Sequence, residues 1–288
     1  MIDYEYLKPK TLDEVLSLLE SYGDRAILIA GGTDVMVNIR NKKLAPEALV
    51  SIRNLTDLAY IKKDDGYHIG ALTTHRMLET SPLIREELSA LYDGASQVGS
   101  VQIRNVATVG GNICNAAPSA DTAAPLLSLD ATAVLKGPKG TRKVSLKDFF
   151  TGPSQTVREK DEVLVEFEIP AAMGEFGSAY HKHSRRKAMD LPILGVAVSL
   201  KVGGDTIEDA RIGLSVAAPT PIRAMKAEEY LRGKPFQDEV LEEAGKIAAQ
   251  EASPRDSLRG QAWYRREVIE IFVPRMAVKA YERLKKQS

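Results

Sequence analysis

Two glycine pairs, each followed directly by polar side chains, are the residues of this sequence best suited to chemistry. The first lies in Ala30-Gly31-Gly32-Thr33-Asp34, and the second lies about eighty positions later, within 108–121. Because glycine permits positive φ and close backbone approach, consecutive amides in such loops can converge on a pyrophosphate. Short polar side chains after the glycines can then bond phosphate or ribitol oxygens; these are Thr33, Asn112 and Asn115. The pattern therefore predicts a nucleotide site formed by both loops.

A single glycine pair after a strand is more often an ordinary tight turn than a ligand site. The recurrence of the pattern with matching polar residues favours the nucleotide. The sequence contains neither G-x-G-x-x-G nor G-x-x-x-x-G-K-S/T, so the site is neither a Rossmann fingerprint nor a P-loop. A carboxylate facing a phosphate would be repelled. We therefore expect Asp34 and Asp121 to accept hydrogen bonds from ribityl or ribose hydroxyls, or to brace the loops.

Three further groups of side chains could suggest catalysis or ligand binding, but each also has a simpler interpretation as a packing or surface group. Cys114 lies in the second loop without an evident base, so we interpret it as a packing residue rather than a nucleophile. His181 and His183 lack a third ligand at recognisable spacing, and we expect solvent or interface roles rather than a metal site. The last group is a basic cluster of Lys182, Arg185, Arg186 and Lys187. It is either a solvated surface or a site that attracts an anionic nucleotide or a partner subunit.

The composition is that of a globular protein. The 288 residues are 44% apolar and 27% charged, and they suffice for one large domain or two smaller ones. Basic and acidic residues both total 39, so the balanced charge gives no electrostatic footprint for nucleic acid. No stretch approaches the ~18 apolar residues of a membrane span, and the N-terminus lacks a signal-peptide pattern. With one cysteine, an iron–sulfur cluster on this chain would lack ligands. We expect a cytoplasmic protein.

The elements that position the two loops begin with a capped helix. Thr11-Leu-Asp-Glu14 is a capping box, and Gly23 can end the helix that follows. Ser81-Pro82 begins a second helix, which we expect to continue through Leu91. Apolar or alternating runs predict strands at 27–30, 49–52, 60–62, 68–71, 133–135 and 162–169.

The pattern changes after residues 173–177. Strand candidates come first, near Ala179 and at 195–202 and 207–216, and helical stretches follow at 222–232, 239–251 and 261–286. Strands followed by helices argue for a second, α+β domain. We therefore predict a first domain at 1–175, with subdomains at about 1–55 and 56–175, and a C-terminal domain at 176–288.

The two loops resemble the pyrophosphate-binding loops of the FAD-binding medium subunit in the xanthine dehydrogenase and carbon monoxide dehydrogenase family of molybdenum hydroxylases. The most specific segment runs from Asn105 to Asp121, and similar segments occur at 6–9, 182–190, 218–223 and 264–266. The resemblance covers essentially the whole chain. It implies an α+β fold with an FAD-binding domain of the p-cresol methylhydroxylase and vanillyl-alcohol oxidase type. A smaller α+β C-terminal domain would follow, with a three-stranded antiparallel sheet and three helices.

Carried over residue by residue, the resemblance implies FAD contacts from both loops and from two positions outside them. These residues are Ala30, Gly31, Gly32, Thr33, Asp34, Val35, Ala107, Thr108, Gly111, Asn112, Cys114, Asn115, Asp121, Leu164 and Lys182. Leu164 falls near a family position that packs against the flavin, and Lys182 falls near a lysine that approaches the isoalloxazine. Nothing marks a covalent attachment, so the expected FAD is non-covalent.

The resemblance also implies an electron-transfer subunit of a three-part enzyme. A molybdopterin-binding large subunit would hydroxylate the substrate, and a small subunit would carry two [2Fe–2S] clusters. This chain would pass electrons through FAD to an acceptor such as NAD. The substrate would be decided on the partner: xanthine is favoured, with carbon monoxide, aldehydes and other N-heterocycles as alternatives. Two other classes stay open, namely a self-contained flavin oxidase and a nucleotide-binding scaffold that takes no flavin.

Overall fold

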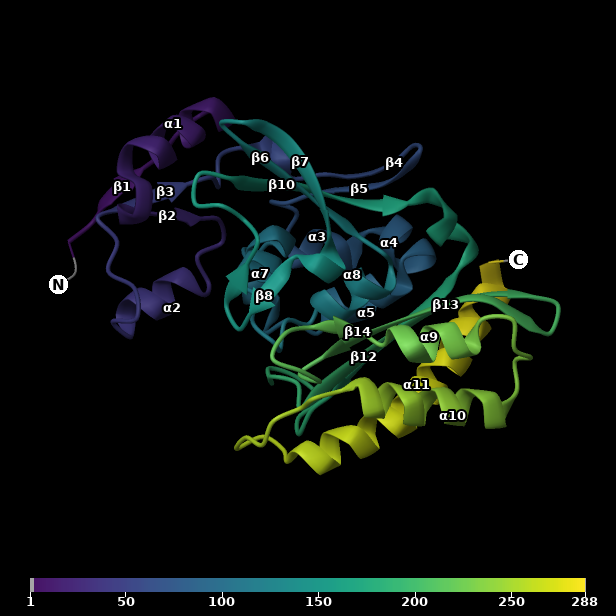
Figure 1. Ribbon diagram of the computed structural model, residues 1–288. Coiled ribbons are helices and arrows are strands. Elements are labelled where there is room, and N and C mark those ends of the chain that lie inside the picture. The colour runs from purple at the N-terminus through teal and green to yellow at the C-terminus, as the bar shows by residue number, and fades with distance from the viewer. Residues whose placement is uncertain (1–2, 288) are drawn as a thin grey trace.

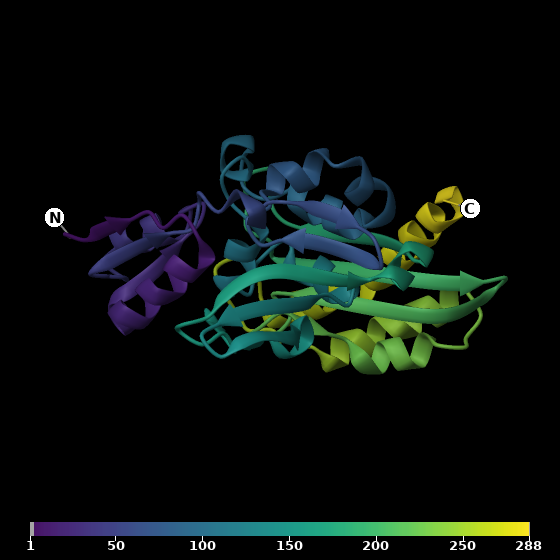
Figure 2. The same ribbon diagram turned by 90° about the horizontal axis from the view of Figure 1, so that it is seen from above.

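In the computed structural model, which describes residues 3–287, the N-terminal unit is a parallel sheet of strand order β1-β3-β2. It stands to one side of the rest of the chain (Figure 1 and Figure 2). Its elements are β1 Glu5–Leu7, α1 Leu12–Tyr22, β2 Ala26–Ile29, α2 Val35–Arg40 and β3 Ala48–Ser51. The predicted cap of α1 is present, because Thr11 Oγ1 accepts a bond of 3.2 Å from the Glu14 amide. Glu14 itself accepts from the amide of Lys10 rather than from that of Thr11.

The middle unit is an antiparallel sheet of order β4-β5-β10-β6-β7 with helices on one side. Its main strands are β4 Ile61–Lys63, β5 Gly66–Gly70, β6 Thr132–Gly137, β7 Gly140–Ser145 and β10 Val163–Pro170. A separate pair is formed by β8 Phe150–Gly152 and β9 Gln155–Thr156. The helices are α3 His75–Thr80, α4 Pro82–Glu87, α5 Ser89–Ser96, α6 Val101–Arg104, α7 Val109–Cys114 and α8 Ala123–Ser128.

The single helix predicted from Ser81 to Leu91 is wrong. Leu88 leaves the helical region, with φ −118° and ψ 50°, and separates α4 from α5. The amide of Ala90, in the first turn of α5, donates a bond of 3.0 Å to Ser178 Oγ in the C-terminal half. The break is therefore associated with a long-range contact and not with a local helix-breaking residue.

The C-terminal unit is an antiparallel sheet of order β11-β12-β13-β14 covered by three helices. Its elements are β11 Gly177–His183, β12 Leu194–Gly203, β13 Thr206–Ser215, β14 Ile222–Arg223, α9 Met225–Leu231, α10 Asp238–Glu251 and α11 Ala262–Gln287. The prediction of a three-stranded sheet is corrected to four strands. Ile222 and Arg223, expected to begin a helix, pair instead with β13 at Leu214 and Gly213. A strand of two residues is too short to show alternation.

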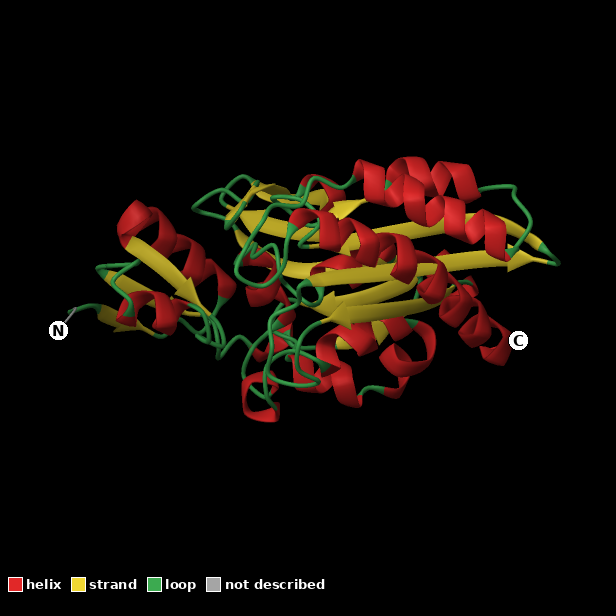
Figure 3. Ribbon diagram, turned by 90° about the horizontal axis from the view of Figure 1, so that it is seen from below, coloured by secondary structure: helices red, strands yellow, loops and turns green. Residues whose placement is uncertain are grey.

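Helices α5 and α8 lie between the middle and C-terminal sheets (Figure 1). All six residues of α8 are buried. A Cβ on Gly213 of β13 would lie 2.1 Å from the carbonyl oxygen of Ala124, so strand and helix touch through their backbones. Helices α9–α11 cover the other face of the C-terminal sheet (Figure 3). Within residues 3–287, no helix is both long and apolar enough to cross a membrane.

Candidate functional site

The first glycine loop connects β2 to α2 and rests directly on the segment before the second loop. A Cβ on Gly31 would lie 2.0 Å from the carbonyl oxygen of Val106, so any side chain there meets backbone. Gly32 has φ +73°, a conformation that favours glycine. In the described part of the chain, the amides of Gly31, Gly32 and Thr33 donate to no protein acceptor. These amides are therefore free to bind an anionic ligand.

The two glycines of the second loop have different roles. Gly110 is buried, its amide donates to the carbonyl of Ala71 at 2.9 Å, and a Cβ there would lie 2.6 Å from the same oxygen. Gly111 is exposed, and a Cβ there would come within 4 Å of Thr108 Oγ1 alone. Thr108 Oγ1 also accepts a bond of 3.1 Å from the Gly111 amide and so caps α7. Gly110 thus packs this segment onto the protein, and Gly111 is exposed in the first turn of α7. The expectation that consecutive amides of the second loop are open to a pyrophosphate is corrected, because the glycines lie in a helix and both amides donate within the protein.

A buried ion pair lies at the wall behind the second loop. Lys182 Nζ donates to Asp121 Oδ2 at 2.8 Å and to the carbonyl of Gln97 at 3.0 Å. The hydroxyl of Tyr180 donates to Asp121 Oδ1 at 3.2 Å. Burial raises the pKa of Asp121 to about 6, although Lys182 and Tyr180 oppose this shift. Asp121 therefore braces β11 against the second loop, one of the two roles expected for it.

Both loops open onto one cavity of about 730 Å³. All predicted site residues except Lys182 line it: Ala30, Gly31, Gly32, Thr33, Asp34, Val35, Ala107, Thr108, Gly111, Asn112, Cys114, Asn115, Asp121 and Leu164. Lys182 lies behind Asp121. The structure thus brings together residues from positions 30 to 164, and their contact with a cofactor remains a prediction.

Arg186, from the basic cluster considered above as a surface or a site for an anionic nucleotide, lines the cavity. Several other lining residues were not among the predicted site residues, namely Arg158, Lys160, Met189, Asp190, Leu191 and Arg259. Part of this set belongs to the 182–190 segment noted above, where the basic cluster was the available signal. Arg158 and Arg259 come from separate segments, and only the tertiary structure places them at the cavity.

His75 is a second residue that the sequence did not single out. It lines the cavity and is completely buried at the start of α3. Neither ring nitrogen has a hydrogen-bond partner among the described residues. Burial, reinforced by the charge of Arg104, lowers the pKa of His75 to about 4, so the imidazole is neutral at pH 7.

Cys114 and the two histidines of β11 have packing roles. Burial raises the pKa of the Cys114 thiol to about 11, and the thiol packs beside the core of the middle unit. Both histidines are partly buried and pack on their own chain, which does not fit a purely solvated role, and the alternative interface role stays a prediction. The ring of His181 stacks on Phe272 with centroids 3.9 Å apart. His183 Nε2 lies 2.8 Å from the hydroxyl of Tyr264, so both histidines pack against α11.

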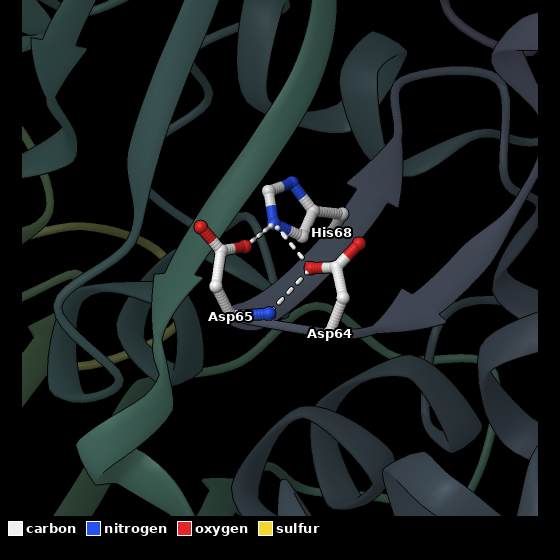
Figure 4. Close-up of side chains that lie close together, drawn as sticks. All are labelled: Asp64, Asp65 and His68. Carbon is white, nitrogen blue, oxygen red and sulfur yellow. Dashed lines mark hydrogen bonds and ion pairs between the residues drawn. The ribbon is translucent and has the colours of Figure 1, made fainter.

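A cluster around His68 lies on the β4–β5 hairpin and not along the cavity (Figure 4). His68 Nε2 is 3.1 Å from Asp64 Oδ1 and 3.2 Å from Asp65 Oδ1. His68 Nδ1 is 3.3 Å from Glu166 Oε1. Burial alone would lower the pKa of His68, but hydrogen bonds with Glu166 and Asp65 outweigh it and the net shift is upward. The cluster is accounted for as a set of ion pairs.

Two family models match the chain over most of its length. The FAD binding domain in molybdopterin dehydrogenase matches residues 2–172, and the CO dehydrogenase flavoprotein C-terminal domain matches residues 178–280. With the paired glycine loops and the α+β architecture, these matches define an FAD-binding flavoprotein.

Individual relatives agree along nearly the full length. The xanthine dehydrogenase FAD-binding subunit of Escherichia coli O157:H7 is 36% identical, over 97% of each chain. The nicotinate dehydrogenase FAD-subunit of Eubacterium barkeri is 35% identical, over 94% of this chain and 93% of its own. A carbon monoxide dehydrogenase structure from Hydrogenophaga pseudoflava superposes with TM-score 0.94 at 34% identity, over 98% of both chains. The chain belongs to the family of FAD-binding medium subunits of molybdopterin hydroxylases, which includes the xanthine and carbon monoxide dehydrogenases. The family and the fold class predicted from the sequence are confirmed.

Proposed function

We propose that this chain binds FAD without a covalent bond and passes electrons through it inside a molybdenum hydroxylase complex. The observation that carries the proposal is the convergence of the two glycine loops on one cavity. The pyrophosphate fits against the free amides of Gly31, Gly32 and Thr33 and the open face of Gly111. Asn112 and Asn115 line the same cavity and add polar groups for phosphate or ribitol oxygens.

The chain's own residues bind and orient the cofactor, and FAD when bound supplies the redox chemistry. Leu164 offers an apolar surface in the cavity, and the pair of Asp121 and Lys182 holds the polar wall. Non-covalent binding is supported by the protonation state of Cys114, which lines the cavity. The Cys114 thiol stays protonated at neutral pH because burial raises its pKa.

We infer that the partners are a molybdopterin-binding large subunit and a small subunit with [2Fe–2S] clusters, and that the acceptor is one such as NAD. The organic substrate would be chosen on the large subunit. Xanthine is favoured, because the 36% identical Escherichia coli relative is a xanthine dehydrogenase subunit. Other relatives carry other substrates in their names: a nicotinate dehydrogenase subunit is 35% identical, a carbon monoxide dehydrogenase medium chain is 34% identical, and a glyceraldehyde dehydrogenase medium chain is 31% identical.

We also propose a division of the chain near residue 175. Strand β10 ends at Pro170, a short 3₁₀ helix spans Ala171–Glu175, and β11 begins at Gly177. Every strand after this point pairs within the C-terminal sheet. The first domain would then be 1–175, with subdomains at about 1–55 and 56–175, and the second 176–288.

The first test is an absorbance spectrum of the purified chain before and after acid precipitation. Flavin bands near ~370 and ~450 nm that move into the supernatant as FAD would support the proposal. Bands retained in the pellet would indicate covalent flavin and favour a self-contained oxidase. A colourless chain that takes up no added FAD would overturn the proposal.

A further inference from the structure

The turn between β9 and β10 brings basic side chains to the cavity from the middle unit. This turn, 157–162, follows β9 and leads into β10, and its residues Arg158 and Lys160 line the cavity. Among the described residues, the other cations that line the cavity are Arg186 and Arg259, which belong to the C-terminal half. The turn is therefore the source of positive charge on the side of the cavity that the first half of the chain forms.

The turn is held in shape by an ion pair. The guanidinium of Arg142, on β7, makes a fork of two bonds to the carboxylate of Glu162, at 2.6 and 2.8 Å. The same guanidinium donates to the carbonyl of Val157 at 2.7 Å, and Glu162 accepts from the amide of Glu159 at 2.8 Å. Glu162 is 8% exposed. The turn is therefore preformed and does not need a ligand to order it.

The guanidinium of Arg158 is fixed on one side and open on the other. Its Nη1 donates to the carbonyls of Glu159 and Glu162, at 2.8 and 2.7 Å. Within residues 3–287, its Nε and Nη2 donate to no protein acceptor. These two nitrogens form the edge through which a guanidinium binds a phosphate by parallel hydrogen bonds. Arg158 therefore offers an unused fork at the wall of the cavity.

The turn lies beside both glycine loops. Lys160 forms an ion pair with Asp24, which stands just before β2, the strand that leads into the first loop. The positive charge of Arg158 opposes the rise in the pKa of the Cys114 thiol, so the guanidinium lies within electrostatic range of Cys114. Cys114 comes one turn after Gly111 in α7, on the same face of the helix. Arg158 is therefore close to the segment that exposes Gly111.

The glycine loops alone do not neutralise an anionic ligand. The amides of Gly31, Gly32 and Thr33 are free to donate, but they carry no formal charge. Asp34 follows them, lines the same cavity, and has no ion pair within the described part of the chain. A pyrophosphate beside this carboxylate needs a cation close by, because like charges in a partly buried site repel each other. Arg158 can supply that cation, since the edge of its guanidinium that binds phosphate is unused.

We propose that Arg158 binds the pyrophosphate of FAD through Nε and Nη2, together with the free amides of the first loop. This assignment rests on the proposed function of the cavity as the FAD site, and it adds a residue that neither glycine loop contains. Lys160 contributes little, because its ammonium is engaged by Asp24. Arg158 holds the cofactor and takes no part in electron transfer. Its loss should therefore weaken FAD binding without changing the reduction potential of the bound flavin.

The test uses the full chain freed of flavin and measures the Kd of added FAD from the change in flavin fluorescence. We expect Arg158→Gln to raise this Kd about tenfold, the usual effect of losing a charge-assisted hydrogen bond. Arg158→Lys should recover part of the affinity, because it keeps the charge but loses the fork. The Kd of ADP, which carries the pyrophosphate without the flavin, should rise by the same factor in Arg158→Gln when it is measured by calorimetry.

Lys160→Gln is the matched control, since it removes one positive charge from the same turn at a side chain already paired with Asp24. Its Kd for FAD should stay within about twofold of the parent chain. Salt distinguishes a charge contact from a displaced turn. The Kd of the parent chain should rise with NaCl concentration more steeply than the Kd of Arg158→Gln, because the variant has lost a screened interaction.

Equal effects of Lys160→Gln and Arg158→Gln on the Kd, or equal salt dependence of Arg158→Gln and the parent chain, would overturn the assignment. A changed reduction potential in Arg158→Gln would also overturn it, because the guanidinium would then act on the flavin ring and not on the pyrophosphate. In each of these cases the parent chain still binds FAD, and the proposed FAD site stands. A parent chain that takes up no FAD would instead overturn the proposed function.

Discussion

Lys182 Nζ lies 2.8 Å from Asp121 Oδ2, and both side chains are almost completely buried, with exposed fractions of 4% and 7%. The pair joins β11 of the C-terminal half to Asp121, at the end of the second glycine loop. Removing one partner of a buried pair leaves the other charge uncompensated, which is costly.

We therefore expect Lys182→Met to lower the free energy of unfolding by about 3 kcal/mol or more. The double variant Lys182→Met with Asp121→Asn should recover much of this loss, because it removes the buried charge as well. Urea denaturation of both variants at pH 7.5 measures the difference. A loss below about 1 kcal/mol for Lys182→Met would contradict the account of the pair.

The glycines of the loops should separate into two classes on substitution. Gly111→Val places a branched side chain at an exposed position, where its Cβ would meet only the side chain of Thr108, at 2.9 Å, and no backbone atom. We therefore expect largely normal secondary structure by circular dichroism but loss of FAD binding. Gly31→Ala and Gly110→Ala drive a Cβ into backbone oxygens at 2.0 and 2.6 Å, so both should destabilise the fold itself. Flavin content measured beside thermal unfolding distinguishes the classes. Normal flavin content in Gly111→Val would refute the placement of the second loop.

His75 should make the fold sensitive to acid. Its folded-state pKa, about 4, is lower than the ordinary value of 6.5, so its contribution to stability is present above pH 6.5 and is lost as the pH falls toward 4. The shift corresponds to about 3 kcal/mol at most. We expect His75→Leu to show a smaller loss of stability between pH 7 and pH 5 than the parent chain, as measured by urea denaturation. An identical pH dependence in the two proteins would show that His75 is not neutral when folded.

His68 serves as a control, because its pKa shift is opposite in sign to that of His75. Its net pKa shift is upward, so its contribution is present below pH 6.5 and is lost as the pH rises through the folded pKa. His68→Gln should therefore reduce stability at pH 5.5 more than at pH 8. The same instrument and denaturant apply to both histidines.

Arg223 joins the two halves of the chain at a distance from the cavity. Its guanidinium makes two bonds to Glu228, at 2.9 and 2.6 Å, and one bond of 2.7 Å to Asp130 beyond the end of α8. Glu228 is 1% exposed. Arg223→Met should therefore cost about 3–5 kcal/mol of unfolding free energy. Arg232→Gln, which removes an exposed pair with Asp209, should cost below about 1 kcal/mol in the same denaturation experiment.

The glycine loops could be predicted from the sequence because their signal is local. Gly31, Gly32, Gly110 and Gly111 stand next to short polar residues, and close packing requires a glycine at Gly31 and Gly110. The strands with clear alternation were also predicted, although their ends moved by one or more residues, as at β10 Val163–Pro170. A local sequence pattern is therefore enough to predict an element whose physical constraint involves only neighbouring residues.

The remaining features depend on contacts between distant residues. The break at Leu88 accompanies a bond between Ala90 and Ser178, and β14 is defined only by its pairing with β13. Likewise Arg259 reaches the cavity because its segment is held by Arg185. Local sequence patterns carry no information about such contacts.

Helix α8 is enclosed by protein on every side, and three of its six residues, Ala123, Ala124 and Ser128, have small side chains. Their volumes set how closely the middle and C-terminal sheets approach. Asp121 lies just before this helix, while Lys182 lies on the sheet beyond it. The width of the helix layer therefore controls the geometry of the cavity wall. A single methyl group added at Ala124 would push the sheet away from the helix, and this displacement would change the distance between Asp121 and Lys182, which the methyl group does not touch.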